Sequence, residues 1–120
     1  MANQLVWVDI PVTDLDRAIG FYSAVLAGPV TKQEYPGMAM GLLPGSGEEV
    51  TGCLHLSDHD HPSDHGPLIY LSCQGRLDEA VTKVEPAGGK VLKAKHEIGP
   101  YGFRAVVLDS EGNRIALHSM

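Results

Sequence analysis

The sequence is poor in cysteine, in basic residues and in long apolar runs. Its 120 residues hold two cysteines, one tryptophan, and nine lysines and arginines against fifteen aspartates and glutamates, so the formal net charge is −6. This balance argues against nucleic acid as a partner, because a phosphate backbone requires a basic stripe that nine scattered cations do not form. A neutral or cationic partner is easier to accommodate.

The two cysteines show no sign of redox or catalytic chemistry. Cys53 and Cys73 lie in apolar stretches without a basic neighbour that would activate a thiol. We expect two free, buried thiols and no disulfide, as in a reducing compartment.

The N-terminal segment resembles neither a targeting signal nor a membrane span. Its first twelve residues, MANQLVWVDIPV, have no basic region and reach Asp9 after four consecutive apolar residues. That run is too short for a signal peptide or a transmembrane helix. We therefore expect a cytoplasmic protein without membrane contact, and 120 residues indicate a single domain.

The first half of the sequence predicts a strand that leads into a helix. Residues 5–12 place apolar side chains at every second position, which is typical of a half-buried strand. Thr13 is the expected N-cap of the helix, and Gly28 followed by Pro29 ends it. The apolar stripe of this helix is formed by Leu15, Ala18, Ile19, Tyr22, Val25 and Leu26.

The second half repeats this pattern. Residues 67–73 form another apolar run, and a helical stripe returns 62 positions later, closed by Gly88 and Gly89. Each half then continues with short segments typical of strands, separated by turns that contain glycine. The second stripe consists of Leu77, Ala80, Val81, Val84 and Ala87.

The sequence therefore predicts an α+β fold of two tandem β-α-β-β-β modules in one domain. In this repeat, displaced by 61 positions, Trp7 matches Leu68 and His55 matches Ala116. The expected parts are module one at residues 4–57, a linker at residues 58–66 and module two at residues 67–120.

Three quoted stretches connect this pattern with a known family. They resemble the vicinal oxygen chelate superfamily, which includes glyoxalase, extradiol dioxygenases and the bleomycin and fosfomycin resistance proteins. The stretches are IPVTDLDRAIGFYSAVL, DSEGNRIALHS and KVEPAGGKVLKAKHEIGPYGFRAVVLDSEGNRIALHS. The resemblance spans nearly the whole chain. It implies a curved sheet from each module enclosing a cavity, while the motifs do not specify the reaction.

The resemblance also implies where many members of the superfamily hold a divalent ion. The four ligand positions fall on Trp7, His55, Leu68 and Ala116, and only His55 carries a ligand atom. A catalytic ion needs about three protein ligands, so we expect that the usual metal site is missing. A rearranged set of His55, His118 and Asp9 could hold Zn, Ni, Mn or Fe, because Asp9 and His118 share strand parity with the family positions.

Residues 55–65 read HLSDHDHPSDH and invite a metal interpretation by composition alone. The repeat places His55 on a strand and the remaining histidines in the linker. There, His59, His61 and His65 alternate with Asp58, Asp60 and Asp64. These side chains either form a surface site for Zn or Ni or extend into solvent, and we favour solvent because nothing preorganises them.

The remaining candidates concern a ligand in the cavity. Trp7 and Tyr70 either form an aromatic wall for a ligand or fill the space left by the missing metal. Tyr101, which follows Gly99-Pro100 and precedes Gly102, either lies on a flexible rim that gates the cavity or is an ordinary loop residue. Arg104 and Arg114 either capture a carboxylate or phosphate or pair with acidic residues of the chain. The full predicted ligand-binding set is Trp7, His55, Leu68, Tyr70, Tyr101, Ala116 and His118.

Two classes of function follow. The first is a metal-free, homodimeric protein that binds a small organic ligand, in the manner of the bleomycin resistance proteins. The alternative is a metal-dependent enzyme of glyoxalase, epimerase or dioxygenase type that uses His55 and rearranged ligands. A third possibility is metal-free acid–base catalysis by His55.

Overall fold

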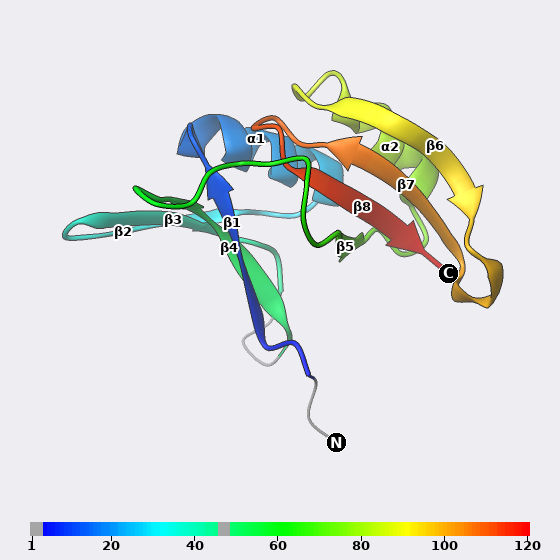
Figure 1. Ribbon diagram of the computed structural model, residues 1–120, viewed down its shortest axis with the longest axis horizontal. Coiled ribbons are helices and arrows are strands. Elements are labelled where there is room, and N and C mark those ends of the chain that lie inside the picture. Colours follow the sequence, from blue (N-terminus) through cyan, green and yellow to red (C-terminus); the bar gives the residue numbers. More distant parts are fainter. Residues whose placement is uncertain (1–3, 46–48) are drawn as a thin grey trace.

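The computed structural model describes residues 4–45 and 49–120 and shows two four-stranded sheets with two helices (Figure 1). Residues 1–3, on which part of the argument about a targeting signal depends, lie outside these ranges. The elements of the first half are β1 (Trp7–Val12), α1 (Leu15–Leu26), β2 (Thr31–Tyr35), β3 (Met38–Leu42) and β4 (Thr51–Leu56). Those of the second half are β5 (Ile69–Ser72), α2 (Leu77–Val84), β6 (Lys90–Glu97), the 3-10 turn η1 (Gly99–Tyr101), β7 (Phe103–Leu108) and β8 (Arg114–Ser119).

The strand order is the same in both halves. It is β1-β4-β3-β2 in the first sheet and β5-β8-β7-β6 in the second. The β1–β4 and β5–β8 pairs are parallel, and the other pairs are antiparallel. The predicted α+β fold of two tandem modules is therefore confirmed.

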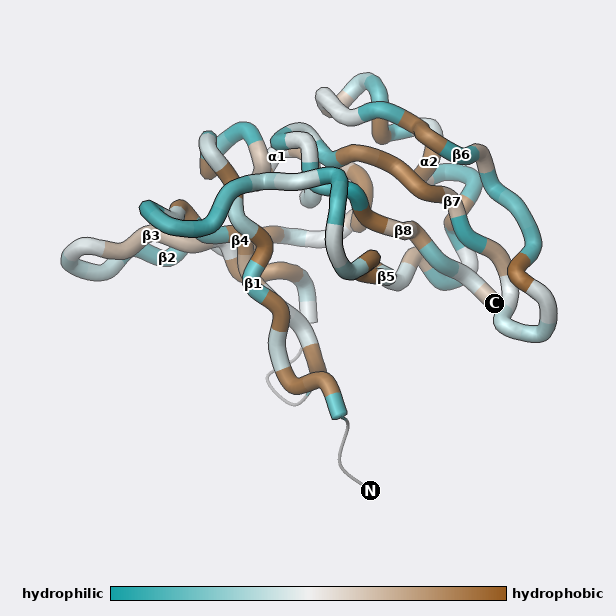
Figure 2. Tube along the Cα trace, viewed as in Figure 1, coloured by the Kyte–Doolittle hydropathy of each residue, from teal (hydrophilic) through white to brown (hydrophobic). Residues whose placement is uncertain are grey.

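A single hydrophobic core joins the two halves. The strands β1, β4 and β8 bury residues such as Ile10, Leu54 and Ile115 in this core, and α1 contacts α2. Figure 2 shows that apolar residues concentrate in these strands, whereas the connection from β4 to β5 is mostly hydrophilic. In the part of the chain that the structure describes, no helix is long and apolar enough to span a membrane.

The ends of several elements differ from the sequence-based expectation. Asp14, and not Thr13, is the N-cap of α1, because its carboxylate accepts the amide hydrogen bond of Arg17 at 3.0 Å. Helix α2 ends at Val84, so Ala87 lies beyond it, although the C-cap residue Glu85 still has helical backbone angles.

The first strand of each half is shorter than predicted. Leu5 and Val6 precede β1 and are 70% and 75% exposed. Strand β5 begins at Ile69, so Leu68 lies just before it. The predicted alternation continues into both flanking segments, but their backbones do not pair with the neighbouring strands β4 and β8.

The turn between β7 and β8 connects module two to the start of α1. The Glu111 carboxylate is fully buried and accepts hydrogen bonds from the amides of Thr13 and Asp14, both at 2.9 Å, and from the Arg17 guanidinium at 2.7 Å. Burial alone would raise the pKa of Glu111, but the hydrogen bonds from Arg17, Asp14, Thr13 and Ser110 outweigh it and lower the pKa to about 2. Glu111 is therefore an ionised cap of the first helix, contributed from the other half of the chain.

A buried polar network lies beside this cap. The Tyr22 hydroxyl donates to the Asp109 carboxylate at 2.6 Å, and Asn113 donates both to Asp109 at 3.0 Å and to the Pro11 carbonyl at 2.8 Å. Burial, followed by the Asp109 charge, raises the pKa of Tyr22 well above its ordinary value, so its hydroxyl stays a donor. These contacts and Glu111 hold the two modules together within one chain.

Candidate functional site

The candidate residues lie on what we call the outer face of each sheet, the side that points away from the helices. On β1, Ile10 and Val12 belong to the core, so Trp7 and Asp9 point outward. On β4, Leu54 belongs to the core, and its neighbours Cys53 and His55 point outward by the same alternation.

Asp9 organises the outer face of the first sheet. Its carboxylate accepts hydrogen bonds from the indole of Trp7 at 2.9 Å and from the thiol of Cys53 at 3.3 Å. Burial and then the neighbouring Asp9 raise the pKa of Cys53 to about 11. Cys53 is thus an inert thiol, and both cysteines are free and buried as expected.

His55 lies on the same face, opposite Met40 of β3 and Pro11 of β1. It is half-buried, and within residues 4–45 and 49–120 its imidazole makes no hydrogen bond. Both ring nitrogens are therefore available to a ligand or a proton.

The register of the strands changes the internal alignment of the repeat. Asp9 lies opposite Cys53 in the first sheet, and Tyr70, which matches Asp9 in the repeat, lies opposite Ala116 in the second. Cys53 is therefore the structural equivalent of Ala116. By the same register, His55 is equivalent to His118. The repeat in the sequence predicted Ala116 as its equivalent, which lies two residues earlier on β8.

The outer face of the second sheet carries a connected polar cluster. Arg104 donates through Nε to His96 at 3.0 Å and through Nη1 to the Tyr70 hydroxyl at 2.5 Å. The Tyr70 ring lies edge-on to His118, with the ring centres 6.1 Å apart. His118 in turn donates through Nε2 to the Tyr101 carbonyl at 2.6 Å, and the Tyr101 side chain is 71% exposed on η1.

Both arginine candidates lack acidic partners. In the described part of the chain, neither Arg104 nor Arg114 forms an ion pair. Arg114 donates to the Gly66 carbonyl at 3.0 Å and so anchors the connection between the modules. The expected pairing of these arginines with acidic residues of the chain does not occur there.

The predicted site residues therefore form two groups, one on each sheet. Trp7 and His55 lie with Asp9 on the first sheet, and Tyr70, His118 and Tyr101 lie together on the second; Leu68 precedes β5 and Ala116 is fully buried. Sequence reasoning missed His96, because β6 is rich in lysine and two irregularities in its pairing with β7 obscure its alternation.

The donor set does not fit the divalent ion that many members of the family hold. Trp7 offers an indole N–H that already donates to Asp9, and Leu68 and Ala116 offer only hydrocarbon. Among the described residues, no three His, Cys, Asp or Glu side chains form a group that could hold an ion, so Asp9, His55 and His118 are not gathered in the chain.

The linker histidines lie apart from these groups. His59 and His65 are exposed, and His65 contacts the adjacent Asp64. The connection is instead ordered by Ser57, which accepts from the Asp60 amide at 2.8 Å, and by the amide of Ser63, which donates to Asn113 at 3.1 Å.

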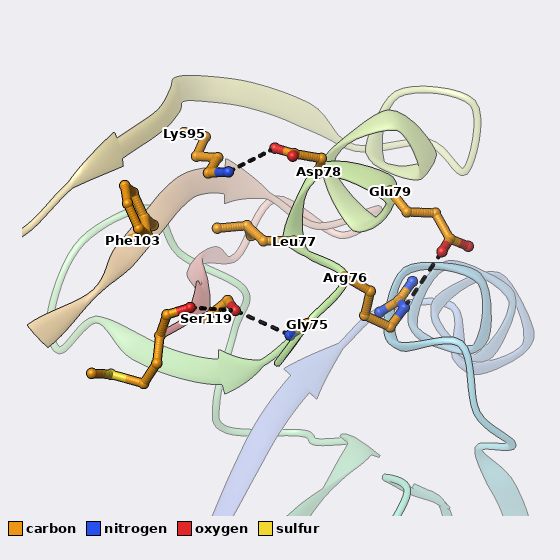
Figure 3. A pocket seen from close by; sticks show the side chains of 9 residues that line it. Gly75, Arg76, Leu77, Asp78, Glu79, Lys95, Phe103 and Ser119 are labelled. Carbon is orange, nitrogen blue, oxygen red and sulfur yellow. Dashed lines mark hydrogen bonds and ion pairs between the residues drawn. The ribbon is translucent and has the colours of Figure 1, made fainter.

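A hollow of about 390 Å³ lies at the start of α2, away from the predicted residues (Figure 3). Two ion pairs lie in it, since Lys95 pairs with Asp78 at 3.1 Å and Arg76 lies 3.9 Å from Glu79. Lys95 also lies over the Phe103 ring, 5.0 Å from its centre. The Nη2 atom of Arg76 is buried and has no hydrogen-bond partner among the described residues.

A family model described as Glyoxalase/Bleomycin resistance protein/Dioxygenase superfamily matches residues 4–117. The chain belongs to this superfamily. A comparison with curated proteins finds no match.

Solved structures of other superfamily proteins share the fold. A glyoxalase/bleomycin resistance protein of Albidiferax ferrireducens T118 has a TM-score of 0.77 at 16% identity, over 98% of this chain and 99% of that chain. The fosfomycin resistance protein FosX of Listeria monocytogenes has a TM-score of 0.69 at 16% identity, over 100% and 95%. The trypanothione-dependent glyoxalase I of Leishmania major has a TM-score of 0.67 at 22% identity, over 98% and 87%. At these identities the likeness establishes the superfamily fold and no particular reaction.

Proposed function

We propose that this superfamily member binds a small organic molecule on the outer faces of its sheets, without the divalent ion that many members hold. The observation that carries the proposal is a pair of exposed but fixed aromatic rings. Trp7 is 45% exposed and held by Asp9, and Tyr70 is 46% exposed and held by Arg104. A ring fixed in this way offers contact area to a ligand at little entropic cost.

The polar groups beside the rings support a binding role. The imidazole of His55 lies on the same face of the first sheet as Trp7, and His118 lies beside Tyr70 on the second. Small-molecule sites typically combine aromatic walls with a few polar groups that orient the ligand. The ligand-binding set of the sequence analysis is thus retained as the proposed site, with Tyr101 at its rim.

Binding can be tested through Trp7, the only tryptophan of the protein. Titration with a panel of small aromatic compounds should quench its fluorescence saturably for at least one compound, and a chelator should leave the affinity unchanged. Tyr70→Leu should weaken the binding of that compound about tenfold, because one wall of aromatic contact is lost. Tyr35→Leu is the matched control, since Tyr35 is similarly exposed, at 53%, but lies on β2.

Two results would contradict this proposal. Saturable binding by no compound of the panel would remove the binding role. About one equivalent of Zn, Ni, Mn or Fe retained after dialysis, and lost in His55→Ala, would instead favour the enzyme with rearranged ligands.

We further propose that the protein is a homodimer in which the second copy borders the outer faces and completes the ligand site between the two chains. Apolar side chains left exposed in one chain would gain stability by burial against a second copy. Light scattering should give twice the 12.8 kDa mass of the chain, and Leu5→Asp should shift the protein toward the monomer, whereas Lys83→Asp on α2 should not. A single-chain mass at all concentrations would refute the dimer. The exposed apolar side chains in question are Leu5, Trp7, Tyr70 and Tyr101.

A further inference from the structure

One row of polar side chains crosses the whole outer face of the second sheet. Strand pairing places Ser72 next to His118, His118 next to Arg104, and Arg104 next to His96. Arg104 therefore lies at the middle of a row that all four strands contribute.

Arg104 keeps donors free for a ligand. A guanidinium has five N–H donors, and those of Arg104 reach only His96, at 3.0 Å, and Tyr70, at 2.5 Å. The Nη2 side of the fork has no partner among the described residues, and no carboxylate there balances the charge. Both contacts hold the fork in place without neutralising it.

Both partners of Arg104 contact it as acceptors. His96 accepts from Arg104 through Nε2, and its Nδ1 lies 2.9 Å from the Ala94 carbonyl, which accepts. The Tyr70 hydroxyl accepts from Arg104, so its own proton remains available to a ligand oxygen.

The exposed apolar surface beside this row is the Tyr70 ring. Ala116, which pairs with Tyr70 on one side and Val106 on the other, comes two residues before His118 along β8. Ala116 is fully buried and Val106 is 6% exposed, so both are covered, whereas Tyr70 is 46% exposed and its ring centre lies 5.9 Å from Cζ of Arg104. A cation with free donors thus borders an exposed aromatic ring.

We infer that Arg104 binds the oxyanion of a small organic anion, a carboxylate or a phosphate, whose apolar body lies against the Tyr70 ring. The guanidinium fork matches such oxygens in pairs, and Tyr70 supplies a further donor. This inference rests on the proposed function and adds the chemical class of the ligand. The net charge of −6 disfavours an anion at long range, so recognition depends on the local, uncompensated charge of Arg104.

The test is an NMR titration of the full-length ¹⁵N-labelled protein with benzoate, phenyl phosphate and neutral benzamide. Benzoate or phenyl phosphate should shift the amide signals of Arg104, Val106 and Ala116, and the stronger of the two identifies the oxyanion. Benzamide should bind at least about tenfold more weakly, because it lacks the charge that pairs with the guanidinium.

Variants separate the role of Arg104 from general charge. Arg104→Gln should weaken the binding of the preferred anion about tenfold or more. Lys83→Gln, which also removes one positive charge but on α2, should have no effect on that binding. Tyr70→Phe keeps the ring and removes one donor, so it should weaken the binding of the anion by a smaller factor. This second variant tests the site even if Arg104→Gln does not fold.

The outcomes distinguish this inference from the proposed function. Equal affinity for benzamide and benzoate, with no effect of Arg104→Gln or Tyr70→Phe, would overturn anion recognition and leave small-molecule binding intact. Absence of any shift on either outer face, with all three compounds and with the aromatic panel, would overturn both.

Discussion

Replacing Glu111 with glutamine is expected to lower the free energy of unfolding by about 2 to 3 kcal/mol. The fully buried carboxylate accepts amide hydrogen bonds from Thr13 and Asp14 at the start of α1 and pairs with Arg17. Glutamine has one oxygen instead of two, so it leaves donors of the first turn unsatisfied. Urea unfolding at pH 7 measures the difference, and Glu97→Gln, at an exposed position on β6, is the matched control.

The same variant should change how stability depends on pH. Because the pKa of Glu111 is lowered from 4.5 to about 2, the unfolded chain binds this proton more readily than the folded protein does. The stability that Glu111 contributes is therefore present above about pH 4.5 and is lost as the pH falls toward 2. Glu111→Gln should flatten this part of the acid unfolding curve, and an unchanged curve would contradict the assigned role of the ionised cap.

Replacing Asp109 with asparagine is expected to cost about 3 kcal/mol of stability. Asp109 is 2% exposed and accepts four hydrogen bonds, from the Tyr22 hydroxyl, from the Asn113 side chain and from the amides of Glu111 and Asn113. An asparagine that keeps the two amide contacts turns its own N–H groups toward Asn113, whose side-chain nitrogen is also a donor.

Asp109→Asn should lower the midpoint temperature of thermal unfolding. The control Asp58→Asn, in the exposed connection between β4 and β5, should leave that midpoint nearly unchanged. Because Asp109 joins β7 and β8 to α1, the loss should also loosen the contact between the modules. Hydrogen exchange of α1 amides would then accelerate in Asp109→Asn. An Asp109→Asn protein as stable as the parent would show that the buried network contributes little.

The amphipathic patterns of the sequence determined the fold class and the direction of most side chains. Alternation along residues 5–12 placed Ile10 and Val12 inward and Trp7 and Asp9 outward, and the two helical stripes located both helices. These patterns are local, because side-chain direction has a period of two in a strand and 3.6 in a helix. They predict which face a residue occupies without predicting its neighbour across the sheet.

The cap of the first helix shows where local reasoning failed. A threonine followed by two aspartates is a good N-terminal signal, yet Asp14 caps α1 and Thr13 binds Glu111, which comes from the far end of the chain. No residue near Thr13 in the sequence predicts a hydrogen bond to a carboxylate about a hundred residues away. Such a contact exists only because the β7–β8 turn folds back onto α1.

The candidate site divides in the same way. By itself, the sequence determined that Trp7, His55, Tyr70 and His118 are chemically suited to a site and that three of the four expected metal positions lack ligand atoms. Tertiary structure decided that these residues lie on two sheets, that Cys53 is the equivalent of Ala116, and that Arg104 contacts Tyr70 and no acidic side chain of the described residues. Register and charge pairing depend on strands far apart in the chain, and the periodicity of a single strand carries no information about them.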